Sequence, residues 1–193
     1  MPRHITAALG FRAHTGWAAV VAVAKDCEIL DRRRIAYEPS TTRFVYHNAA
    51  DMPPDKAAAS IELAGAETGK AAELEIHSLI AALAQKKIVV RTACVPAGNS
   101  KLPEMLADIL AAHSRIHAAE GVFYREALVA ACRSLGIRVK RAPERDLRTL
   151  AANALGSTVE DVQKRFQSMA KYLGPPWGED QKLATLAACF ALG

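Results

Sequence analysis

The residues best suited to chemistry by type and spacing are His113, His117 and Glu120. At intervals of four and three residues they share one face if the segment is a continuous helix. Imidazoles one turn apart can bind a transition metal on one side of a helix. The run lacks the further His–Glu pairing of known zinc hydrolase motifs, so we favour surface or interhelix hydrogen bonding and expect no metal and no cofactor. A place in a cleft beside Arg12 or His14 is the other interpretation.

A second candidate for chemistry is His14, which precedes Thr15 in a tight turn between two short apolar runs. A histidine can act as an acid or a base near neutral pH, and the threonine hydroxyl can donate a hydrogen bond to a substrate oxygen. The sequence offers no nucleophile with a recognisable base and orienting carboxylate. A structural turn histidine is therefore the interpretation we favour.

Composition favours a folded, basic protein. The 193 residues are 51% hydrophobic, which fits a single domain over residues 1–193 with a real core. The formal net charge of +5 permits binding to nucleic acid or another polyanion. Apolar runs fall short of the roughly 20 residues of a membrane span, and residues 1–10 lack the apolar segment of a signal peptide, so we expect a cytoplasmic protein without a membrane partner.

The four cysteines are far apart and form no Cys-x-x-Cys pair; they are Cys27, Cys94, Cys132 and Cys189. A zinc site or a disulfide framework normally shows closer, patterned spacing. We therefore expect buried, reduced thiols.

Hydrophobic periodicity predicts strands at residues 5–11, 17–24, 28–37, 88–95 and 137–141. It predicts helices at residues 54–85, 146–155, 158–173 and 179–192, with Ser157 and Glu160 at capping-box spacing. A further helical stretch opens at residues 99–103, around Ser100, and runs to Leu135 with a break near Ser114. Residues 38–51 show no readable element. This order predicts an α/β protein with a mixed five-stranded sheet, in which three antiparallel strands lead into parallel crossover units, and with helices on both faces.

Residues 9–20, Leu-Gly-Phe-Arg-Ala-His-Thr-Gly-Trp-Ala-Ala-Val, resemble the first hairpin of RuvC-type Holliday junction resolvases, which belong to the ribonuclease-H-like superfamily. In the family, the first strand of that hairpin has the pattern hydrophobic-Gly-hydrophobic-Asp, and the second strand begins with Thr-Gly-aromatic. Arg12 occupies the position of the aspartate. Later segments resemble the family in the same order: a long second helix at 116–133, a short helix with a glycine-serine turn at 148–157, and a proline-containing connection into an acidic terminal helix at 173–184.

The resemblance implies the ribonuclease-H-like fold and a cluster of four carboxylates that holds two divalent cations for phosphodiester hydrolysis. The matching positions here fall on Arg12, Arg91, Glu179 and Lys182, although a shift of one residue offers Asp180 instead. An arginine cannot lose its proton to become a metal ligand. We therefore expect a degenerate site and no active metal-dependent nuclease.

Two consequences of this charge reversal stay open. Arg12, Arg91 and Lys182 can form an anion pocket, because guanidinium groups bind phosphate or carboxylate through paired hydrogen bonds. Alternatively they pair internally, since buried arginines need acidic partners. The partners available for such pairing are Glu120, Glu179 and Asp180.

The function we expect is non-catalytic binding of nucleic acid, or of another phosphorylated or anionic ligand, through a basic face. The resemblance and the charge pattern assign nucleic-acid contacts to Arg138, Lys140 and Arg148. An enzyme with a different, non-two-metal chemistry in the same cleft is the first alternative, with acid–base groups drawn from His14, Glu120, Glu179 and Asp180. A regulatory or scaffold homodimer is the second.

Overall fold

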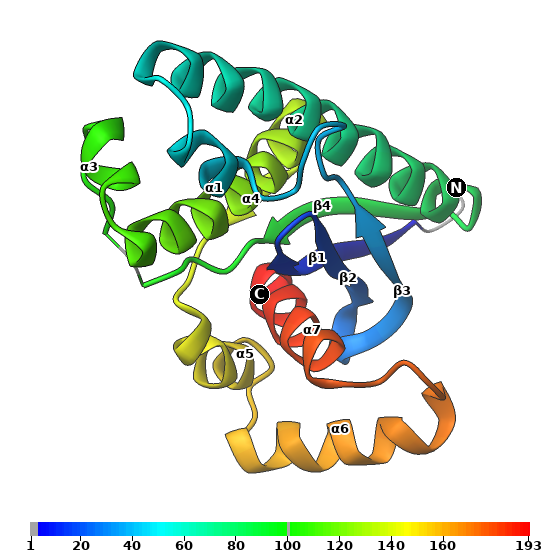
Figure 1. Ribbon diagram of the computed structural model, residues 1–193. Helices are drawn as coiled ribbons and strands as arrows, with labels where there is room; N and C mark the ends of the chain where they lie inside the picture. Colours follow the sequence, from blue (N-terminus) through cyan, green and yellow to red (C-terminus); the bar gives the residue numbers. More distant parts are fainter. Residues whose placement is uncertain (1–3, 100) are drawn as a thin grey trace.

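The computed structural model describes residues 4–99 and 101–193, so Ser100, in the opening of the predicted helical stretch, lies outside the described residues. Its centre is a five-stranded sheet of order β3-β2-β1-β4-β5 (Figure 1). The strands are β1 (Ile5–His14), β2 (Trp17–Ala24), β3 (Glu28–Ala36), β4 (Ile88–Cys94) and β5 (Arg138–Lys140). The first three pair antiparallel, whereas β4 runs parallel to β1 and β5 runs parallel to β4. The predicted mixed sheet is confirmed.

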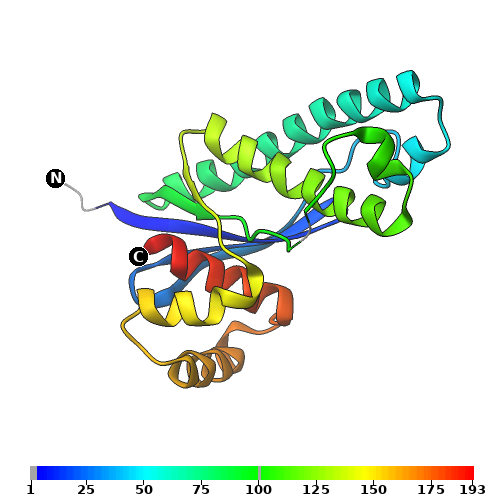
Figure 2. The ribbon, with the colours of Figure 1, turned by 90° about the vertical axis from the view of Figure 1, so that its left-hand side faces the viewer.

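Helices cover both faces of this sheet (Figure 2). One layer holds α1 (Val45–Ala50), α2 (Pro54–Gln85), α3 (Leu106–Leu110) and α4 (His113–Ser134). The other holds α5 (Leu147–Ala154), α6 (Val159–Leu173) and α7 (Glu179–Leu192), and short 3-10 turns, η1 (Lys25–Cys27) and η2 (Glu144–Asp146), precede β3 and α5. Helix α1 lies in the segment where the sequence shows no element. The break between α3 and α4 falls at residues 111–112, slightly before Ser114.

The side chains of β1 alternate between the two layers, as strand geometry requires. Leu9 and Phe11 are buried in the cluster formed with α2 and α4. Gly10 faces α7, and a Cβ added there would lie 1.9 Å from the carbonyl oxygen of Ala184, so the helix backbone packs directly on the strand. Arg12, two residues further along, shares the α7 side of the sheet.

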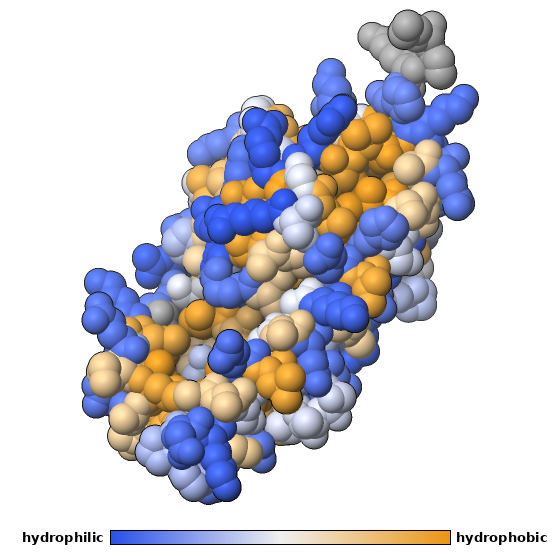
Figure 3. All heavy atoms as spheres, turned by 90° about the horizontal axis from the view of Figure 1, so that it is seen from above, coloured by the Kyte–Doolittle hydropathy of each residue, from blue (hydrophilic) through white to orange (hydrophobic). Residues whose placement is uncertain are grey.

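Helix α2 buries one stripe of mainly apolar residues. Ile76, Leu79 and Leu83 are at most 1% exposed and pack on the sheet. Viewed from the α2 side, the surface mixes hydrophilic side chains with apolar patches (Figure 3). Leu63 and Leu74 of this helix are 59% and 62% exposed. Within the described segments, no helix combines the length and apolarity needed to cross a bilayer.

The arginines of β3 have separate structural partners. Arg32 donates to three backbone carbonyl groups at the end of α6 and in the loop after it. Arg33 pairs with Asp31 at 2.8 Å, and this hydrogen bond lowers the pKa of the Asp31 carboxyl below its ordinary value. The Arg34 guanidinium lies 4.6 Å from the centre of the Trp17 ring. This run therefore fixes the fold and does not supply one basic patch.

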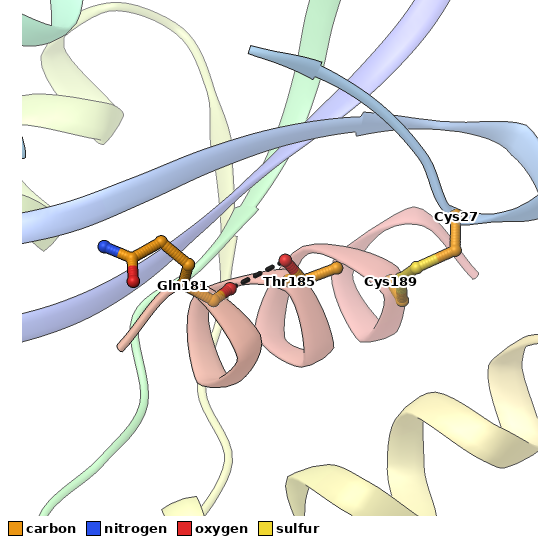
Figure 4. The surroundings of a disulfide bond; sticks show 4 residues. All are labelled: Cys27, Gln181, Thr185 and Cys189. Carbon is orange, nitrogen blue, oxygen red and sulfur yellow. Dashed lines mark hydrogen bonds between the residues drawn. A yellow bond between two sulfur atoms is a disulfide. The ribbon is translucent and has the colours of Figure 1, made fainter. Parts of the chain in front are cut away.

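Two of the four cysteines are bonded to each other. Figure 4 shows the disulfide between Cys27, in the turn before β3, and Cys189 of α7. The expectation of reduced thiols is wrong for this pair, because α7 crosses the sheet beside that turn and brings the two Cα atoms to 5.8 Å. Cys94 and Cys132 are free and buried, and burial raises the pKa of both thiols to about 12. Both thiols are therefore protonated at neutral pH and serve as core residues.

Helix α6 begins one residue later than its predicted capping box. Thr158 is the N-cap, and its hydroxyl oxygen accepts a hydrogen bond from the Asp161 amide at 3.1 Å. The hydroxyl in turn donates to the Asp161 carboxylate at 2.8 Å. Ser157 and Glu160 therefore do not form the box, because the true cap stands between them.

Candidate functional site: a basic cleft at the end of β1

Two hollows meet at the C-terminal end of β1, and both are lined by Arg12, Ala13 and Arg125. The larger, of about 540 Å³, lies between the loop after β4 and the helices α5 and α7. The smaller, of about 260 Å³, extends towards α1 and α4 and is lined by His14 and Glu120. We call the two hollows together the cleft. It occupies the carboxyl ends of the parallel strands β1 and β4, where open α/β sheets commonly bind ligands.

Arg12 stands in the middle of the cleft and is held by two carboxylates. One terminal nitrogen forms an ion pair with Glu144 of η2, and its Nε lies 3.8 Å from Oδ1 of Asp180 on α7. All three side chains are about a third exposed, at 29%, 36% and 33%. Asp180 is one of the partners offered by the sequence, whereas Glu144 is not. Because a permanent positive charge stands between these two carboxylates and repels other cations, the residues do not fit the two-cation centre that the resemblance implies.

The three basic residues of the predicted anion pocket do not come together. Arg91 is exposed on β4, level with Ala7 and Ala8 of β1, and therefore lies well before the end of the strand where Arg12 stands. Lys182 lines a separate hollow of about 220 Å³ on the other side of Arg148 and Glu179. Of the three, Arg12 alone lines the cleft.

His14 is the last residue of β1 and is held from two sides. Its Nε2 lies 2.8 Å from Oδ1 of Asp180, and its ring stacks on Trp17 with the ring centres 4.1 Å apart and the planes 9° apart. The side chains of His14 and Asp180 are 32% and 33% exposed. Asp180 therefore contacts both Arg12 and His14, and the His14 side chain that it orients lines the smaller hollow.

Arg125 of α4 is a cleft residue that the sequence reasoning missed. Its guanidinium lies against two glycines: a Cβ would stand 2.5 Å from Nη2 at Gly98 and 3.0 Å at Gly121. Burial lowers the pKa of Arg125 and the neighbouring charges of Arg141 and Arg12 lower it further, whereas the more weakly acting charges of Glu144 and Glu126 raise it. Among residues 4–99 and 101–193, it forms no ion pair. The available signal was Gly121 one helical turn before Arg125, which leaves room for a large side chain on that face.

Glu120 is buried and its carboxylate binds backbone amides at the start of α1, so it is not a free acid–base group in the cleft. Its Oε1 accepts hydrogen bonds from the backbone amides of Tyr46, at 2.8 Å, and His47, at 3.3 Å, and lies 3.2 Å from Nδ1 of His47. The predicted helix-face histidines touch each other, with Nε2 of His113 and Nε2 of His117 2.9 Å apart. His47 packs against both rings. The structure thus adds a third histidine to the pair.

The residues predicted to contact nucleic acid divide between two places. Arg138 and Lys140 line a hollow at β5 and the C-terminal end of α7, where Lys140 donates to the carbonyl oxygen of Phe190 at 3.2 Å. Arg148 lines the cleft, together with Arg145. Arg148 is therefore the predicted contact that lies beside Arg12 and Arg125 in the cleft.

No family model matches the chain, and no curated protein sequence matches it. Among solved structures, RuvC of T. thermophilus in complex with a Holliday junction substrate aligns over 96% of this chain and 91% of its own, with a TM-score of 0.50 and 10% identity. A structure of Thermus thermophilus RuvC aligns over 95% of this chain and 92% of its own, with a TM-score of 0.48 and 9% identity. At such identity the likeness concerns the fold alone, and with the sheet order described above it identifies the chain as a protein of ribonuclease-H-like fold.

Proposed function

We propose that the chain binds nucleic acid, or another ligand that carries phosphate groups, in the cleft, without two-cation hydrolysis. The observation that carries this proposal is Arg125, a half-buried guanidinium with no acidic partner among the described residues. Withdrawing such a charge from water is unfavourable unless something pairs with it. A bound anion supplies that pairing.

The charges around Arg125 support the same ligand class. Four arginines and two glutamates line the larger hollow; they are Arg12, Arg125, Arg145, Arg148, Glu144 and Glu179. Each guanidinium offers paired donors that match the oxygens of a phosphate group. Arg12, Arg145 and Arg148 already contact acidic side chains, so Arg125 is the arginine of the hollow without such a contact among the described residues.

The test is binding to duplex, single-stranded and four-way junction DNA, measured by fluorescence anisotropy over a series of salt concentrations. The junction is included because one compared RuvC structure contains a Holliday junction. If Arg125 neutralises one phosphate, Arg125→Gln should reduce the slope of log K against log salt for duplex by about 0.9. The matched control is Arg165→Gln, on the exposed side of α6 and outside the cleft, which should leave the slope unchanged.

Two binding results and one activity result would contradict the proposal. One is a flat salt response, or no binding, with all three forms of DNA and with phosphorylated small ligands. The other is an equal effect of Arg125→Gln and Arg165→Gln, because that would place the contact outside the cleft. Magnesium-dependent cleavage that is lost in Asp180→Asn would show that a two-cation centre exists after all.

A second candidate function is acid–base chemistry on a small anionic substrate in the smaller hollow. The pair of His14 and Asp180, 2.8 Å apart, is the observation that favours it. A carboxylate that orients an imidazole in this way is a common arrangement for a general base. A small ligand that raises the melting temperature, and loses this effect in His14→Gln but not in the control His4→Gln, would favour this function over nucleic-acid binding.

A further inference from the structure

We propose that His47, His113 and His117 form a binding site for a divalent transition metal ion such as Zn²⁺. Each residue offers a ring nitrogen, and these nitrogens all lie within 4.8 Å of one another. In the part of the chain that the structure describes, no other group of three or more His, Cys, Asp or Glu side chains converges in this way. The inference goes beyond the proposed function and does not depend on it.

The spacing of the three rings suits a single ion. Zinc–nitrogen distances of about 2.0–2.1 Å and tetrahedral angles require ligand nitrogens about 3.3 Å apart. Nε2 of His113 and Nε2 of His117 are 2.9 Å apart, and the ring centres of the three histidines are separated by 4.4 to 5.3 Å. His113 and His117 are exposed, so small rotations of their side chains bring the three nitrogens to equal spacing.

Glu120 prepares His47 for this role. A carboxylate only accepts hydrogen bonds, so the contact of 3.2 Å places the proton on Nδ1 of His47. The lone pair is then on Nε2, the nitrogen that remains for a metal. Carboxylates hold metal-binding histidines in this orientation in many proteins, and they raise the basicity of the ring.

A second feature of Glu120 also indicates a cation. Its side chain is 4% exposed, and Oε2 is buried without a hydrogen-bond partner among the described residues. A buried carboxylate with one unsatisfied oxygen is electrostatically costly unless positive charge lies near it. An ion bound by the three histidines would supply that charge through His47.

The ligand set also defines the class of metal. Imidazole nitrogen suits zinc, copper and nickel, whereas magnesium and calcium prefer oxygen ligands. Three protein ligands leave a fourth position open, as in zinc sites that bind water or substrate. His47 and His117 line the smaller hollow, so this position is accessible from the cleft.

The experiment is a titration of the full chain, freed of metal with a chelator, with Zn²⁺ by calorimetry and with Co²⁺ by visible absorption. We expect one equivalent of Zn²⁺ per chain and Co²⁺ bands typical of nitrogen ligands. His113→Gln and His117→Gln should each weaken binding by about 100-fold or more, since even residues that only orient a ligand contribute about 10–100-fold. The control His77→Gln, on the exposed side of α2, should bind like the parent chain.

The proposal is overturned if no saturable equivalent binds, or if the affinities of His113→Gln and His117→Gln equal that of the parent chain. Glu120→Gln keeps the shape of the side chain, and a loss of about 10–100-fold in zinc affinity would support the role of the carboxylate. If Glu120→Gln unfolds the chain because the residue is buried, the zinc affinities of His113→Gln and His117→Gln decide whether the site exists. DNA binding measured with a chelator present tests the proposed function separately.

Discussion

Gly98→Ala tests whether the position of the Arg125 guanidinium, and not only its charge, matters for ligand binding. A Cβ at residue 98 would lie 2.5 Å from Nη2 of Arg125 and 3.0 Å from its Cζ. Carbon and nitrogen atoms pack at about 3.5 Å or more, so the guanidinium must retreat by about 1 Å. Because Arg125 is long and flexible, the side chain can move without disturbing the backbone.

The expected loss of affinity follows from that displacement. A hydrogen bond of about 2.9 Å that lengthens by about 1 Å is broken. One hydrogen bond to a charged group contributes about 1.5–3 kcal/mol, which corresponds to a rise in Kd of about 10- to 150-fold. Gly98 does not have a positive φ, so stability should change little or increase by about 0.4–1 kcal/mol.

Fluorescence anisotropy with the tightest-binding DNA gives the affinity, and its salt dependence gives the number of phosphates neutralised. Gly98→Ala should weaken binding while the salt slope stays near the parent value, because the charge is retained. Arg125→Gln should reduce both the affinity and the salt slope. Gly69→Ala is the matched control, since a Cβ there meets no atom within 4 Å. Parent-like affinity in a folded Gly98→Ala variant would refute the assigned position of the Arg125 contact.

Three further variants test the frame of the cleft. Gly10→Ala places a Cβ 1.9 Å from the Ala184 carbonyl oxygen, and we expect thermal unfolding to show a loss of about 1–3 kcal/mol or more in the free energy of unfolding. A double variant with alanine at both Cys27 and Cys189 lacks the disulfide, which joins positions 162 residues apart in the sequence. Denaturant titration should show a loss of about 2–5 kcal/mol in the free energy of unfolding. Arg12→Gln removes the ion pair from Glu144 and leaves Asp180 with His14 alone, and the same titration should show a loss of about 1 kcal/mol in the free energy of unfolding because the pairs are partly exposed.

The fold was largely predictable because its elements carry clear periodicity. Helix α2 has the predicted bounds, and the five strands lie where apolar runs predict them. Helix α1 was missed because its six residues are too short to show a period. Its first amide groups are held by Glu120, which comes from α4 in a distant part of the chain. Such a contact depends on tertiary structure and leaves no local pattern.

The site was predictable at single positions but not as a constellation. The resemblance of the hairpin puts Arg12 on its first strand, and Arg12 lies in β1 two residues before the strand ends at His14. Arg91 was grouped with it through the family resemblance, whereas the pairing of β1 with β4 sets Arg91 level with Ala7 and Ala8, well before Arg12 along the sheet. His47 could not be joined to His113 because it lies on the helix that the sequence did not reveal. Strand register and helix packing decide both cases.

Arg12 and Arg125 show how the same charge takes two different roles in one cleft. Arg12 reaches Glu144 and Asp180, so it joins η2 and α7 to the sheet. Arg125 has no acidic partner among the described residues, and the nearby charge of Arg12 makes its own charge less favourable in the free protein. Removal of Arg12 should therefore reduce stability more than binding, and removal of Arg125 should do the reverse. A bound phosphate relieves the repulsion between the two guanidinium groups, so ligand binding should stabilise the parent chain more than it stabilises an Arg125→Gln variant.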